Sequence, residues 1–77
     1  MVSKDERYLV LCQSFASAFR RLKRQREIKH SHIAKALGIR YDMLWHFDKG
    51  NCLPRSADLV ELARFFGVTM EQMLGLK

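Results

Sequence analysis

The chain is short and basic, with 77 residues, a formal net charge of +6 and 48% hydrophobic residues. This length allows one domain, here residues 1–77, and the apolar content argues against intrinsic disorder. No apolar run reaches the length of a membrane span, and the start MVSKDERY lacks a signal-peptide pattern. We therefore expect a cytoplasmic protein whose positive charge suits a polyanionic partner such as nucleic acid.

A long helix is predicted first, over residues 5–25. Its apolar residues recur at spacings of three and four and form one stripe: Tyr8, Leu11, Cys12, Phe15, Phe19 and Leu22. Two apolar residues, Leu9 and Val10, do not lie on this stripe. They are explained by fraying of the helix end, by a surface for a partner, or by a helix that begins later. Arg20, Arg21, Lys23, Arg24, Arg26 and Lys29 then form a basic cluster within ten residues.

Two short helices follow, over residues 30–37 and 41–49. Gly38 fits the left-handed position that ends the first, Ile39 packs inward as the turn's apolar anchor, and Gly50 ends the second. Two helices that meet steeply through a short glycine-containing turn form a helix-turn-helix. In a small basic protein this unit usually places its second helix in the DNA major groove.

The last third of the chain predicts two further helices. One begins at Ser56 or Asp58 and ends at Gly67, and a short final helix is capped by Thr69. Strand signals are absent, so the predicted fold class is all-α with five helices.

The outward side of the predicted helix 41–49 carries unusual residues. Leu44 and Phe47 point toward the core, with Met43 beside them, and the opposite arc holds Tyr41, Asp42, Trp45, His46 and Lys49. An exposed tryptophan and tyrosine one turn apart suggest a contact surface. We predict base contacts from Arg40, Tyr41, Asp42, Trp45 and His46, although the central positions lack the Arg, Gln and Asn that make the commonest bidentate contacts.

Residues 19–74 resemble the helix-turn-helix domain of the phage Cro and lambda-type repressor family, also called the XRE family. The resemblance rests on a series of residues in register: Phe19, Leu22, Lys23, Ile28, Ile33-Ala34, Leu37-Gly38-Ile39, Leu44, Phe47, Asp48-Lys49-Gly50, Pro54, Leu59, Leu62, Ala63, Phe66-Gly67-Val68 and Leu74. It implies a five-helix domain, preceded here by a helical extension over 1–18, that binds operator DNA, commonly as a homodimer.

The resemblance also implies roles for single residues. An ion pair between Lys23 and Asp48 is expected to join the first and third helices. The position of His30 is typically a glutamine that contacts a phosphate, which His30 could do more strongly when protonated. The position of Arg40 is usually a capping Ser or Thr, so the start of the third helix departs from the pattern. Phosphate contacts are predicted from Lys29, His30, Lys49, Asn51 and Arg55.

The sequence thus predicts a sequence-specific DNA-binding transcriptional regulator that acts as a repressor. Enzyme activity is not expected, since the sequence has no nucleophile elbow, phosphate loop or paired carboxylates. The alternative is a protein-interaction module that docks its partner on Tyr41 and Trp45. No cofactor is expected, and His30 and His32 lack a third metal ligand. Cys12 is expected to be buried, whereas Cys52 lies in a loop where a redox role stays open.

Overall fold

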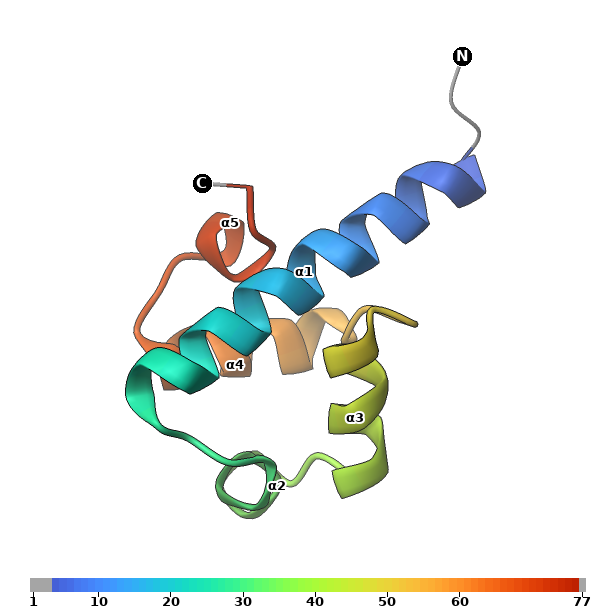
Figure 1. Cartoon of the computed structure of the whole chain (residues 1–77). Coiled ribbons are helices and arrows are strands. Elements are labelled where there is room, and N and C mark those ends of the chain that lie inside the picture. The colour runs from blue at the N-terminus through green and yellow to red at the C-terminus, as the bar shows by residue number, and fades with distance from the viewer. Residues whose placement is uncertain (1–3, 77) are drawn as a thin grey trace.

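The computed structural model describes residues 4–76, which form five α-helices without any strand in that range (Figure 1). They are α1 (Lys4–Arg26), α2 (His30–Leu37), α3 (Tyr41–Lys49), α4 (Ser56–Phe66) and α5 (Met70–Met73). The predicted all-α class is confirmed, and the helices 30–37 and 41–49 have the predicted bounds. Residues 1–3 and 77 of the predicted domain lie outside the described residues.

The long helix α1 packs through the apolar stripe that its sequence predicts. The buried members of the stripe are Cys12, Phe15, Phe19 and Leu22. The N-terminal turns of α1 project beyond the other helices (Figure 1), and there Leu9 and Val10 are exposed. The apolar spacing predicts Tyr8 on the stripe, but its side chain is 45% exposed, and its hydroxyl accepts a hydrogen bond from the N–H of Leu53 at 3.2 Å.

A tight reversal of the backbone ends α1 without a glycine. Glu27 takes a positive φ of 52°, the N–H of Ile28 donates to the carbonyl of Lys23 at 2.9 Å, and the N–H of Glu27 donates to Arg24 at 3.3 Å. This pair of hydrogen bonds is the Schellman motif that commonly closes a helix. It directs the chain back toward α3, so that α2 starts beside the C-terminal half of α1.

Helices α2 and α3 are joined by residues 38–40 and cross steeply, since Figure 1 views α2 along its axis and α3 from the side. Gly38 has a φ of 68°, and its N–H donates to the carbonyl of Ala34 at 2.9 Å. This left-handed conformation is one that a side chain disfavours, which is why glycine suits the end of α2. Ile39 is buried and anchors the turn, as its apolar character predicted.

Helices α4 and α5 pack against each other and complete the core. Thr69 caps α5 as predicted: its hydroxyl accepts from the N–H of Gln72, and the Gln72 side chain accepts from the N–H of Thr69. The Ser14 hydroxyl donates to the carbonyl of Leu74 at 2.8 Å and so fixes the end of the chain to α1. No helix in the described range is both long enough and apolar enough to cross a bilayer.

Candidate functional site

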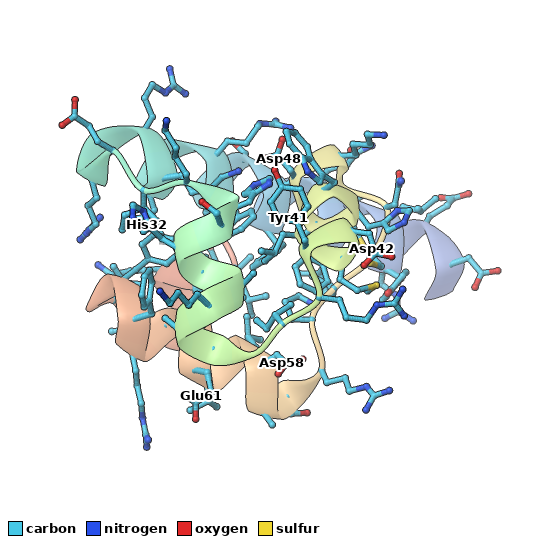
Figure 2. All side chains as sticks on the ribbon, turned by 90° about the horizontal axis from the view of Figure 1, so that it is seen from below. His32, Tyr41, Asp42, Asp48, Asp58 and Glu61 are labelled. Carbon is cyan, nitrogen blue, oxygen red and sulfur yellow. The ribbon has the colours of Figure 1, made fainter. Side chains whose placement is uncertain are left out.

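The solvent-facing side of α3 carries the residues that the sequence placed there. Leu44 and Phe47 are buried, whereas the exposed residues of this helix are Tyr41, Asp42, Trp45, His46 and Lys49. Tyr41 and Trp45 are 53% and 46% exposed, which is high for large aromatic side chains. Figure 2 shows Tyr41 on the side of α3 toward α2 and Asp42 on the side away from it. The predicted contact surface is therefore accessible.

The exposed aromatic pair is connected to the core through His30. The His30 ring stacks on Phe19 with centroids 5.8 Å apart, and its centroid lies 4.5 Å from that of Trp45 in an edge-to-face arrangement. Trp45 in turn meets Tyr41 edge to face at 6.3 Å. Aromatic pairs prefer these offset and edge-to-face geometries. The contact with His30 thus orients the Trp45 ring on its core-facing side, while the rest of the ring is exposed to solvent.

The side chain of His30 is largely buried, and its contact with a phosphate stays a prediction. His30 is only 7% exposed, and its Nε2 lies within hydrogen-bonding distance of the Lys23 ammonium. Burial lowers the pKa of His30, the Lys23 charge lowers it further, and the Asp48 carboxylate opposes both. The imidazole is therefore a neutral acceptor for Lys23, because a cationic ring at this position would be desolvated and repelled.

Lys23 joins α1, α2 and α3 at one point. Its ammonium donates to Asp48 Oδ1 and lies 4.4 Å from the centre of the Phe19 ring. The pair with Asp48, expected from the family resemblance, is thus present in the structure. Arg20 adds a second link, since its Nη1 donates to the backbone carbonyl of Asp48 at 2.7 Å. These contacts fix α3 against α1 and set the position of its exposed face.

Arg40 and Asp42 form an ion pair at the start of α3. Arg40 Nη2 lies 3.0 Å from Asp42 Oδ2, and the two side chains are 79% and 57% exposed. Arg40 makes no side-chain cap for α3, consistent with its departure from the usual Ser or Thr. Exposed pairs of this kind are weak, so either side chain can turn toward a bound partner at little cost.

Basic residues lie on both flanks of the exposed α3 face. Lys29 lines a cavity on the Tyr41 flank, and Arg55 lies with Arg40 around a second cavity on the Met43 flank. Lys49 and Asn51 are exposed at the C-terminal end of α3. With the exception of His30, the predicted phosphate-contacting residues are therefore exposed around one helix.

The sequence did not predict the cavity between α1, α2 and α3. It has a volume of about 630 Å³ and includes Arg20 and Arg24 of α1 in its wall, together with Tyr41 and Trp45. The basic cluster near the end of α1 was visible in the sequence. Its convergence with the aromatic pair depends on how α1 packs against α3, which spacing alone does not reveal.

The two cysteines are free and differ in burial. Cys12 is fully buried, as predicted. Cys52 packs partly against the core, and burial raises the pKa of its thiol, with nearby Cys12 raising it further. A raised pKa leaves less thiolate at neutral pH and therefore lowers reactivity.

Comparison of the chain with protein-family models, with curated proteins and with solved structures finds no significant match. Within residues 4–76, no group of three or more His, Cys, Asp or Glu side chains is arranged to hold a metal ion.

Acidification is expected to destabilise the fold through His30. Because the pKa of folded His30 lies below the ordinary value of 6.5, the unfolded chain binds the proton more readily. Stability should therefore fall as the pH drops through 6.5 toward the folded pKa. We expect His30→Gln to lose less stability than the wild type between about pH 7.5 and pH 5, measured by urea unfolding.

The matched control is His32→Gln, which removes an exposed imidazole from the same helix. It should retain the pH dependence of the wild type. A pH dependence that is the same in the wild type and in His30→Gln would contradict the role assigned to His30.

Proposed function

We propose that this chain is a sequence-specific DNA-binding regulator of transcription, of the helix-turn-helix type, that acts as a repressor in the cytoplasm. Helix α3 enters the major groove and presents Tyr41, Asp42, Trp45 and His46 to base edges. The observation that carries the proposal is the exposed α3 face with basic residues on both flanks. A duplex offers the matching surface, because phosphates line both sides of its groove.

The resemblance to the Cro and lambda-type repressor family supports this proposal from the sequence side. In such proteins a steep helix pair positions the second helix for base contacts, and phosphate contacts set its orientation. In this chain, Lys29, Lys49, Asn51 and Arg55 are proposed to contact phosphates. The backbone N–H groups at the start of α2 would assist, since helix N-termini favour anions.

The test is fluorescence anisotropy with a labelled DNA fragment from beside the protein's own gene, followed by selection of bound sequences. Affinity should fall steeply with salt, and Lys49→Ala should weaken binding to all sequences and reduce the salt slope by about 1. Arg64→Ala is the matched control, because it removes one exposed positive charge from α4 and should leave binding within about twofold of the wild type. Absence of salt-dependent duplex binding would contradict the proposal.

A second candidate function is the docking of a protein on the same face. It is favoured by the two exposed aromatic rings and by the absence of Arg, Gln and Asn from the central outward positions of α3. Tyr and Trp are enriched where proteins meet. Trp45→Ala separates the two candidates: a loss of DNA affinity or an altered sequence preference favours DNA, whereas unchanged DNA binding with loss of a co-purifying protein favours docking.

The proposed regulator acts as a homodimer, which would match the two-fold symmetry of typical operators. Leu9 and Val10 provide an exposed apolar surface on the projecting turns of α1, where they are 51% and 61% exposed. Sedimentation should detect a dimer on DNA. A monomer at high protein concentration, both free and on DNA, would contradict this part of the proposal.

A further inference from the structure

The cavity beside α3 has the size and position of a small-molecule site. Its volume of about 630 Å³ falls within the range of roughly 300–1,000 Å³ that is typical of ligand pockets. Three elements line this open cavity: the C-terminal half of α1, the start of α2, and the Tyr41 flank of α3. Because these elements are held together by Lys23 and Asp48, the cavity is formed before any ligand arrives.

The charge of the wall favours an anion. Four basic side chains and two carboxylates line the cavity, but Lys23 and Asp48 are already paired with each other. Arg24 and Lys29 are exposed and form no ion pair with another side chain in the described part of the chain. These two cations are therefore available to an anionic group in the cavity.

The start of α2 adds unpartnered hydrogen-bond donors to the same wall. The first backbone hydrogen bonds of α2 are donated by His32 and Ile33, and no side chain caps the helix. The N–H groups of His30 and Ser31 are thus left for an acceptor, and both residues line the cavity. Independently, His30 Nδ1 is buried without a hydrogen-bond partner among the described residues. Since Nε2 accepts from Lys23, Nδ1 carries the proton, but this atom has almost no accessible surface, so we assign the contact with the ligand to the backbone N–H groups of α2 and not to Nδ1.

The remaining part of the wall is aromatic. Tyr41 and Trp45 line the cavity and are both about half exposed, so a planar ring can pack on them. A ligand that uses both parts of the wall needs an aromatic ring and an anionic group in one small molecule. We propose that the cavity binds a small aromatic phosphate, of which a nucleoside monophosphate is the simplest representative.

In this arrangement the phosphate lies near Arg24, Lys29 and the start of α2, and the base packs on Trp45 or Tyr41. Binding itself does not depend on the proposed DNA-binding function. Its consequence does, because Tyr41 and Trp45 also belong to the face proposed to read DNA. A nucleotide in the cavity would compete with the duplex, which makes it an effector that releases the regulator from its operator.

The experiment is isothermal titration calorimetry of the full chain, without DNA, with AMP, adenosine and inorganic phosphate as separate titrants. We expect AMP to bind with a dissociation constant on the order of 1 mM or tighter, and more tightly than either adenosine or phosphate. Arg24→Ala should weaken AMP binding roughly five- to tenfold. Arg21→Ala, which removes an exposed arginine from the same helix but outside the cavity, should change it less than about twofold.

Each outcome decides a part of the proposal. No detectable AMP binding, or an equal loss in the Arg24 and Arg21 variants, would overturn the site. Phosphate binding as tight as AMP would overturn the ring contact, and adenosine binding as tight as AMP would overturn the anion contact. Since none of the titrations contains DNA, a failure to bind AMP is distinguishable from a failure to bind a duplex. AMP binding by a chain that does not bind DNA would support the ligand site and contradict only the DNA-binding function.

Discussion

Replacing Phe19 with alanine is expected to lower the free energy of unfolding by about 3–5 kcal/mol. Phe19 is fully buried, and its ring stacks on Phe15 at 5.5 Å and meets Phe66 edge to face at 6.2 Å. Its other neighbours are His30 and the Lys23 ammonium. Truncation would leave a cavity between helices that cannot all move inward, and it would remove the ring on which His30 stacks.

Urea unfolding followed by circular dichroism measures this effect. The matched control is Phe65→Ala, because Phe65 is only partly buried and, among residues 4–76, its one aromatic partner is Phe66, at 5.3 Å. The control should lose roughly half as much stability. If Phe19→Ala does not fold, Phe19→Leu keeps the test measurable with an expected loss of about 1–2 kcal/mol. A loss for Phe19→Ala no larger than that for Phe65→Ala would contradict the central position of this ring.

The helices could be predicted from the sequence because their signals are local. Apolar spacing gave the stripe of α1, and Gly38 and Gly50 marked the ends of α2 and α3 at positions where the structure has left-handed backbone. The outward face of α3 followed from the same periodicity. Its exposure is confirmed, while its role as a base-reading surface stays a prediction.

The surroundings of that face could not be predicted from local patterns. His30 begins α2 at a position that a helix by itself would leave exposed, and its burial results from contacts with Phe19 of α1 and Trp45 of α3. The cavity wall likewise depends on the angle at which α1 passes α3. The Lys23–Asp48 pair was expected only through the family resemblance, since residues 25 apart give no signal of contact by themselves.

Asp48→Ala is expected to lower the free energy of unfolding by about 2–3 kcal/mol, since it breaks a charge-assisted hydrogen bond in a mostly buried setting. The Lys23 and Asp48 side chains are only 13% and 20% exposed. Without Asp48, the Lys23 ammonium keeps His30 as its remaining polar partner but has no counter-ion. The loss should be below that of a fully buried pair, because some solvent still reaches both side chains.

Asp42→Ala is the matched control, since it makes the same chemical change in the same helix. Its pair with Arg40 is exposed, so a loss of about 0.2–1 kcal/mol is expected. A double-mutant cycle with Lys23→Met identifies the cause: in that background, Asp48→Ala should cost less, because no unpaired ammonium is left behind. Equal costs in both backgrounds would show that Asp48 acts through something other than Lys23. Because the Lys23–Asp48 pair also fixes the position of α3, Asp48→Ala should change Trp45 fluorescence as well: the Trp45 ring contacts His30, and His30 is hydrogen-bonded to Lys23.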